Sequence, residues 1–253
     1  MGVLHLVRTE HYRGNANVKK IAIDQSNYIP WKGYFDMINM VDEFVLYDDV
    51  QYTKRDWRNR NKIITPTGPR WITIPVVVKG KFFQKIKDVE VADAGWIDVH
   101  LKTLQAFYSR APFYRQYKDY IASLYDKCRT EDHLSRINYI FLKGLCDLIG
   151  IKTKLTFSSA YELCDGKNER LLTIIRQSGS DYYLSGPAAK DYIDESMFRA
   201  QGVALEWMDY SGYPEYRQQW DSFDHGVTIL DLLFNVGPDI QKYLKSFNPK
   251  PEA

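Results

Sequence analysis

The chain has 253 residues, a length that fits one α/β domain with room for an inserted subdomain. Its 34 basic and 32 acidic residues leave a net charge of +2, which argues against a generic nucleic-acid or membrane-surface binder, because such proteins carry a large basic excess. The three cysteines are widely spaced, which argues against a disulfide framework or a zinc knuckle and favours a cytoplasmic protein. The sequence has no run of about 20 apolar residues, which argues against a transmembrane segment.

The first predicted elements form a strand-loop-helix-strand unit. Residues 1–19 are polar and are expected to be an extension outside the fold. An apolar run at residues 21–23 predicts a buried strand, and a polar loop at 25–33 leads into a pattern of helical spacing. Residues 44–47 predict a second strand. The unit is about 30 residues long, which is the size of a parallel crossover.

The middle of the chain contains two blocks of different character. Residues 62–91 predict a β-rich insertion, with a hairpin or meander at 63–76 and a further strand at 82–91. Residues 96–150 show apolar side chains at helical spacing and close at Gly150, a typical residue after a helix C-terminus.

In the rest of the chain, short apolar runs near residues 154, 182 and 204 predict three more strands, separated by helical patterns. The last helix is predicted from His225 to Val236, and residues 248–253 are expected to be a tail. Alternating strands and helices are typical of an α/β fold. The sequence therefore predicts a single domain at residues 20–247, with a Rossmann-like, mainly parallel sheet covered by helices on both faces.

Polar residues gather in the loops that follow the predicted strands. These loops cover residues 25–33, 48–61, 158–170, 185–190 and 209–225. Because ligands of parallel sheets bind outside the carboxyl ends of the strands, we expect the loops to meet in one site at one edge of the sheet.

The second of these loops carries a cluster of basic side chains. Its predicted binding residues are Tyr52, Lys54, Trp57, Arg58, Asn59, Arg60 and Asn61. The basic groups offer contacts to phosphate or carboxylate, and the rings could stack on a base or a sugar. A solvated charged turn is the alternative. The patch is short and isolated, so nucleic acid is not predicted as a partner.

Two carboxylates, Asp48 and Asp49, precede the basic cluster. They could hold the Mg²⁺ that a nucleotide carries, or one could act as a general base. They could equally pair with the nearby arginines in a structural role. Apart from this Mg²⁺, no cofactor is predicted.

Two other loops offer candidate binding groups. In the first loop these are Gln25, Asn27, Trp31 and Gly33, where the glycine would allow a ligand to approach the start of a helix. In a later loop they are Ser185, Gly186 and Lys190, a second candidate anion pocket. A simple turn into a helix is the alternative for the first loop.

His225 is the histidine chosen as a candidate catalytic residue. An imidazole that titrates near neutral pH suits general acid-base work. The alternative is a residue at the start of a helix, packed under the aromatic side chains Trp220 and Phe223.

Long ordered motifs give the chain a resemblance to the WbqC-like family of bacterial proteins. The motifs are QSNYIPWKGYF at residues 25–35, DDVQYTK at 48–54, DWRNRN at 56–61, YLSGPA at 183–188, PEY at 214–216, His225 and DLLFN at 231–235. The resemblance covers nearly everything from Lys20 to about Tyr243. Many members carry His-Gln-Pro where this chain has Asp24-Gln25-Ser26, so the role of that histidine does not carry over.

The resemblance implies an enzyme of bacterial cell-surface polysaccharide or nucleotide-sugar biosynthesis, such as O-antigen or lipopolysaccharide assembly. Together with the predicted anion-binding loops, it favours a transferase that moves an acyl or aminoacyl group from a small donor to a nucleotide-linked amino sugar. A glycosyltransferase that holds its metal on Asp48 and Asp49 is one alternative. A non-catalytic nucleotide-sugar-binding or scaffold protein is another. The sequence leaves the oligomeric state open.

Overall fold

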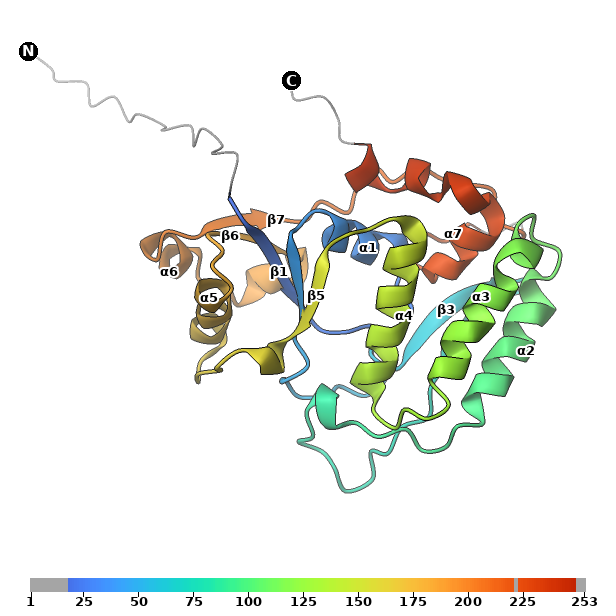
Figure 1. The fold of residues 1–253 in the computed structure, drawn as a ribbon, viewed down its shortest axis with the longest axis horizontal. Coiled ribbons are helices and arrows are strands. Elements are labelled where there is room, and N and C mark those ends of the chain that lie inside the picture. The colour runs from blue at the N-terminus through green and yellow to red at the C-terminus, as the bar shows by residue number, and fades with distance from the viewer. Residues whose placement is uncertain (1–17, 221–222, 249–253) are drawn as a thin grey trace, which may run out of the picture.

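A parallel sheet forms the centre of the computed structural model, which describes residues 18–220 and 223–248 (Figure 1). Its strands are β1 (Lys20–Asp24), β2 (Glu43–Leu46), β5 (Lys154–Phe157), β6 (Tyr182–Ser185) and β7 (Ala204–Trp207). Their order is β5-β2-β1-β6-β7, and all neighbouring strands run parallel. The five predicted strands therefore share one sheet, and the predicted α/β class is confirmed.

Helices cover both faces of the sheet (Figure 1). The helices of the described chain are α1 (Lys32–Asn39), α2 (Trp96–Tyr108), α3 (Tyr114–Lys127), α4 (Leu134–Ile149), α5 (Lys167–Gln177), α6 (Glu195–Ala200) and α7 (Ile229–Val236). Side chains alternate across each strand, so Ile23 and Val45 pack toward α5 and α6, whereas Ala22 and Phe44 join the larger core with α1, α4 and α7.

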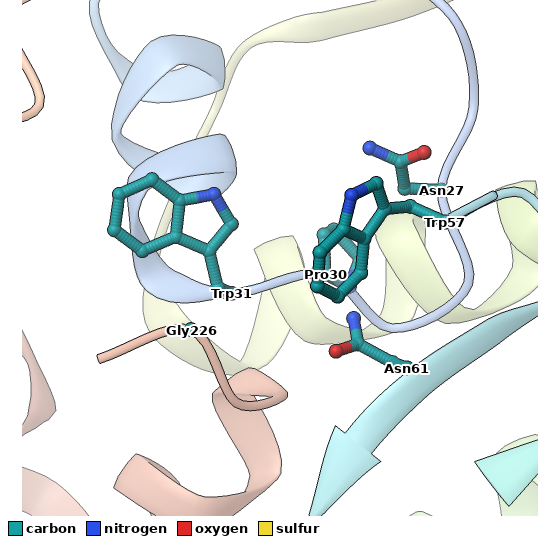
Figure 2. Close-up of a pocket in the computed structure, with 6 residues that line it drawn as sticks. All are labelled: Asn27, Pro30, Trp31, Trp57, Asn61 and Gly226. Carbon is teal, nitrogen blue, oxygen red and sulfur yellow. The ribbon is translucent and has the colours of Figure 1, made fainter. Parts of the chain in front are cut away.

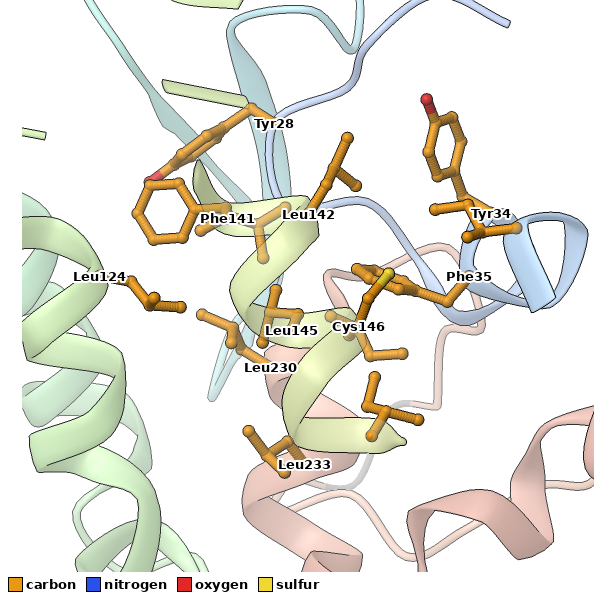
Figure 3. Close-up of a cluster of buried hydrophobic side chains, with 14 of the residues drawn as sticks. Tyr28, Tyr34, Phe35, Leu124, Phe141, Leu142, Leu145, Cys146, Leu230 and Leu233 are labelled. Carbon is orange, nitrogen blue, oxygen red and sulfur yellow. The ribbon is translucent and has the colours of Figure 1, made fainter. Parts of the chain in front are cut away.

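Helix α4 is the centre of the larger core. Figure 3 shows its side chains Phe141, Leu142 and Leu145 between α3, α1 and α7, where they approach Leu124, Phe35 and Leu230. The helix ends at Gly150, whose φ of 94° lies in the left-handed region that glycine adopts without a steric cost. The predicted helical block at residues 96–150 thus consists of α2, α3 and α4.

The β-rich insertion contains one hairpin, formed by β3 (Arg60–Thr65) and β4 (Gly68–Thr73). The predicted strand at residues 82–91 is wrong. In its place lie a 3₁₀ helix, η1 (Ile86–Asp88), and isolated bridges to Gln51, Val76 and His133. Because these bridges reach three different segments, the backbone groups of this stretch are satisfied one at a time and no strand ladder forms.

The last predicted helix also begins later than expected. Helix α7 starts at Ile229, because Thr228 caps it by accepting a hydrogen bond from the N–H of Leu230 at 3.4 Å. His225 therefore lies in a turn and does not open the helix. Most of the predicted extension and tail, residues 1–17 and 249–253, lies outside the described residues. Within the described part, no helix is long and apolar enough to cross a membrane.

Candidate functional site

The loops at the carboxyl ends of the strands contact one another, as the sequence predicts. The backbone N–H of Ser26, after β1, donates to Asp48 after β2 at 2.9 Å. The hydroxyl of Ser158, after β5, donates to Asp49 at 2.9 Å. These contacts join three of the five polar loops at one edge of the sheet.

The strand order reverses at β1: β2 and β5 extend the sheet on one side of it, and β6 and β7 on the other. Such a switch point is where open α/β sheets bind ligands. Asp24 ends β1 there, and its Oδ1 accepts the N–H of Gln25 at 2.7 Å. Burial raises the pKa of Asp24, and the charge of Arg58 opposes this rise. Asp24 is not among the site residues predicted from the sequence, although its position at the end of the first strand is a usable signal.

Asp48 has a buried, structural environment. Its Oδ1 accepts the N–H of Ser26, and its Oδ2 accepts the hydroxyl of Ser135 from α4. Burial raises the pKa of Asp48, while the hydrogen bonds from Ser135 and Ser26 partly offset that effect. The carboxylate is therefore engaged in joining the first loop to α4.

Asp49 is also engaged, but with lysines. Its Oδ1 lies 2.5 Å from the Nζ of Lys87 and 3.6 Å from the Nζ of Lys85, and its Oδ2 accepts the Ser158 hydroxyl. Burial acts to raise the pKa of Asp49, but the hydrogen bonds from Lys87 and Ser158 outweigh it and lower the pKa. The predicted pairing of these carboxylates with nearby arginines is not found: Asp48 is held by serines, and Asp49 by Ser158, Lys85 and Lys87. Among the described residues no group of three or more His, Cys, Asp or Glu could hold a metal ion.

Arg58 connects the second loop to the first. Its Nη1 donates to the Oδ1 of Asn27 and, at 3.5 Å, to the carbonyl of Gln25, and its Nη2 lies 3.6 Å from Asp56. Two buried polar atoms in this cluster, the Nε of Arg58 and the Oε1 of Gln25, have no hydrogen-bond partner within the described structure. Unsatisfied buried groups are costly and are common at functional sites.

A cavity of about 250 Å³ opens between the first loop, the second loop and the turn before α7 (Figure 2). Trp31 and Trp57 stand on its two sides, with Asn61 and Gly226 below them in this view. Asn27 and Pro30 complete the lining. The two indoles form a surface suited to a flat or ring-shaped ligand, because aromatic faces bind apolar ring surfaces.

Three of the predicted binding residues fix the backbone around this cavity. The amide of Asn61 donates to the carbonyls of Tyr28 and Ile29 at 3.1 and 2.9 Å, which holds Ile29 at a positive φ of 40°. The amide of Asn59 donates to the carbonyl of Ile74 at 2.8 Å and accepts the hydroxyl of Tyr52 at 3.0 Å. These side chains therefore preorganise the cavity wall.

Basic and aromatic side chains alternate on the rim next to Trp57. The ring of Trp57 packs 4.9 Å from that of Trp71, and the guanidinium of Arg60 lies 4.1 Å above Trp71. The Nζ of Lys62 lies 5.8 Å from the Trp57 ring and 3.6 Å from Asp224. Lys54 is exposed. Lys62 was not among the residues chosen from the sequence.

The start of α1 is occupied by the protein's own side chains. An added Cβ on Gly33 would lie 2.3 Å from the indole of Trp31, so the glycine makes room for that ring. Lys32 is buried, and its Nζ donates to the carbonyl of Pro214 at 2.8 Å and lies 5.2 Å from the rings of Tyr213 and Tyr216. Burial lowers the pKa of Lys32 to about 8. Lys32 was likewise missed, because nothing in the local sequence shows that a distant loop covers it.

The loop after β6 lies on the other side of the switch point. Ser185 is buried, and its hydroxyl donates to that of Tyr183 at 3.2 Å. Gly186 leads into the 3₁₀ helix η3 (Pro187–Asp191), which carries Lys190 as predicted. The Nζ of Lys190 lies 5.4 Å from the ring of Trp207. This loop borders the switch point but does not line the aromatic cavity.

His225 lies beside the cavity, because its neighbour Gly226 forms part of the lining. Its ring packs edge-to-face against Phe223 at 4.5 Å, and its Nδ1 is buried without a partner within the described structure. Burial lowers the pKa of His225, and the charge of Lys32 lowers it further. Both effects favour the neutral imidazole.

Comparison with known proteins agrees with the resemblance seen in the motifs. The WbqC-like protein family matches the chain over residues 25–243. The chain is 47% identical over 228 residues to the uncharacterized protein Rv1507c of Mycobacterium tuberculosis (strain ATCC 25618 / H37Rv), a match that covers 90% of this chain and 98% of the relative. No solved structure matches the chain.

Proposed function

The chain belongs to the WbqC-like protein family, and from this premise we propose that it is an enzyme of bacterial cell-surface polysaccharide or nucleotide-sugar biosynthesis. The proposed reaction is the transfer of an acyl or aminoacyl group from a small activated donor to the amine of a nucleotide-linked amino sugar. The proposed location is cytoplasmic, where nucleotide sugars are made.

The observation that carries this proposal is the cavity between Trp31 and Trp57 (Figure 2). Its volume of about 250 Å³ suits one sugar ring or one base, while the rest of the ligand would lie along the rim. The rim carries the cations of Lys62 and Arg60 and leads to the half-buried Arg58. A ring-binding cavity beside fixed cations matches the two parts of a nucleotide sugar, its rings and its diphosphate.

The site also supports the proton transfer that acylation of an amine requires. The amine nitrogen forms a bond to the carbonyl carbon of the donor, the leaving group departs with its electron pair, and the amine gives up a proton. His225 is the proposed base, because it directly precedes Gly226 of the cavity lining and a lowered pKa favours the neutral imidazole that can accept a proton. Asp24, a carboxyl with a raised pKa at the end of β1, is the second candidate.

The environments of Asp48 and Asp49 argue against the glycosyltransferase alternative in its predicted form. Both carboxylates would have to be presented to a metal ion, yet Asp48 is held by Ser135 and Ser26, and Asp49 is held by Lys87. Losing these contacts to bind a metal would leave buried polar groups unpaired.

The proposal is tested by incubating the protein with a panel of nucleotide-linked amino sugars and activated acyl donors, followed by mass spectrometry. The expected product is the intact nucleotide sugar with one acyl group in place of an amine hydrogen. The matched control is the same nucleotide sugar with a hydroxyl in place of the amine, which should remain unchanged. Release of the nucleoside diphosphate with transfer of the sugar would identify a glycosyltransferase. Tight binding without any product would identify a scaffold protein.

A further inference from the structure

Two neighbouring phenylalanines stand out on the surface of the protein. Phe82 is 68% exposed and Phe83 is 81% exposed, which makes them the most exposed large apolar side chains in the described ranges. Their rings pack edge-to-face with centroids 4.9 Å apart, so they form a single apolar unit in contact with water. Contiguous exposed apolar groups are typical of surfaces that bind a protein or a membrane.

The backbone holds this pair outward on an ordered turn. The N–H of Gln84 donates to the carbonyl of Lys81 at 3.4 Å, which places Phe82 and Phe83 at the two central positions of the turn. The side chain of Gln51 donates to the carbonyl of Phe82 at 3.0 Å, and the N–H of Tyr52 donates to that of Gln84 at 2.9 Å. In Figure 1 this loop, in teal, projects from the lower side of the molecule. The rings are thus presented by fixed structure.

The segment around the phenylalanines is basic. Residues 79–87, the 79–87 loop, contain four lysines and no acidic residue. Lys79 is exposed, and Lys81 and Lys85 keep 40% and 49% of their side chains exposed. Three acidic residues face the loop. Glu90 pairs with Lys81 at 2.7 Å, and the buried Asp49 pairs with Lys85 and Lys87. Asp88 directly follows the loop in the sequence. Four lysines against three carboxylates, one of them buried, leave the outer surface cationic.

We propose that the 79–87 loop binds the surface of an anionic lipid bilayer. Phe82 and Phe83 enter the boundary between headgroups and acyl chains, and the lysines contact the lipid phosphates, an arrangement that combines apolar insertion with attraction to anionic lipids. Lysine suits this position because its apolar stem can lie along the membrane while its ammonium stays in water.

The shape of the patch favours a bilayer over a protein partner. A stable protein interface buries about 1,000 Å² or more, whereas the apolar part of this loop is two rings at the tip of a turn. Lys87 ties the loop to Asp49 at the carboxyl end of β2. A membrane bound by this loop would therefore lie beside the carboxyl edge of the sheet, where the candidate site is.

Co-sedimentation with vesicles tests the proposal on the full-length protein. The probes are vesicles of phosphatidylcholine alone and of phosphatidylcholine with about one third phosphatidylglycerol, an anionic fraction chosen to give the negative surface potential that attracts lysines. The compared proteins are the wild type, the variant Phe82→Ser/Phe83→Ser, and the control Met40→Ser/Val99→Ser, which replaces two exposed apolar residues elsewhere. Unchanged melting temperatures would show that all three are folded.

We expect the wild type and the control to sediment with the anionic vesicles and the phenylalanine variant to bind at least about tenfold more weakly, because most of the inserted apolar area is lost. Binding should also weaken when NaCl rises from about 0.1 M to about 1 M, since the Debye length shortens from about 10 Å to about 3 Å.

Three results would overturn the proposal. They are no binding of the wild type to anionic vesicles, equal binding by the phenylalanine variant, and a wild-type dimer in sedimentation velocity that the phenylalanine variant dissociates. The last would show that the loop contacts a second copy of the chain. The assay contains no nucleotide sugar, so its outcome does not depend on the proposed reaction.

Discussion

Removing the indole of Trp57 should weaken nucleotide-sugar binding without unfolding the protein. Trp57 forms one wall of the cavity and is 38% exposed, so its side chain contributes only part of its area to packing. Stacking of a ring on an aromatic side chain is worth about 1–3 kcal/mol, by analogy with bases on aromatic platforms. Such a loss corresponds to a change of about 5- to 150-fold in the dissociation constant. We expect Trp57→Ala to raise the Kd within this range.

Trp71 provides the matched control. It is also 38% exposed and packs 4.9 Å from Trp57, but it does not line the cavity. Trp71→Ala should therefore lower the melting temperature of the protein about as much as Trp57→Ala does. It should leave the Kd for the nucleotide sugar nearly unchanged. Isothermal titration calorimetry with a nucleotide sugar and thermal melting of both variants make the comparison. Equal losses of affinity in the two variants, or an unchanged Kd for Trp57→Ala, would refute the assignment of the cavity.

The rest of the structure gives four further predictions. Arg58→Ala should raise the Kd for a nucleotide sugar about ten- to a hundredfold in calorimetry, since a hydrogen bond to a charged group is worth about 1.5–3 kcal/mol; an unchanged Kd with a large fall in melting temperature would assign Arg58 a structural role. Asp48→Ala should lower the free energy of unfolding by about 2–4 kcal/mol in urea titrations, because the buried N–H of Ser26 and hydroxyl of Ser135 lose their acceptor; no change in stability would contradict this. Burial raises the pKa of Asp231 to about 6 from its ordinary 3.8, and the carboxyl accepts the hydroxyls of Tyr108 and Tyr216 at 2.8 Å each. Its contribution to stability is therefore fully present below about pH 4 and lost as the pH rises through about 6, so Asp231→Asn should flatten the stability profile between these values. His225→Gln should lower kcat about a hundredfold or more with little change in Kd, as expected for the loss of a general base, and an unchanged kcat would transfer that role to Asp24.

The centre of the sheet could be predicted from the sequence because β1, β2 and β6 are short and largely buried. Ile21 and Ala22 contact opposite layers of helices, and this explains the continuous apolar run. The segment at residues 82–91 has strand-like residues too, but its apolar side chains Phe82 and Phe83 face solvent. Apolar content alone does not tell a buried strand from an exposed loop, so that prediction failed.

The position of the candidate site could be predicted from the sequence, but the hydrogen-bond partners of its charged side chains could not. The carboxyl ends of parallel strands share one edge, and there the loops after β1, β2 and β5 contact one another. The partner of Asp48 is Ser135, 87 residues further along the chain, and the cover of Lys32 is the loop at Pro214. Contacts over such sequence separations follow from the packing of α4 and the C-terminal segment, which no local pattern encodes.

The central claim, that a nucleotide sugar binds between the two indoles, is tested most directly by a crystal structure with such a ligand. We predict a ring of the ligand between Trp31 and Trp57, with the diphosphate directed toward Lys62 and Arg58. A ligand seated instead in the separate hollow lined by Trp207, Asp209 and Lys245, with both indoles uncovered, would contradict the account.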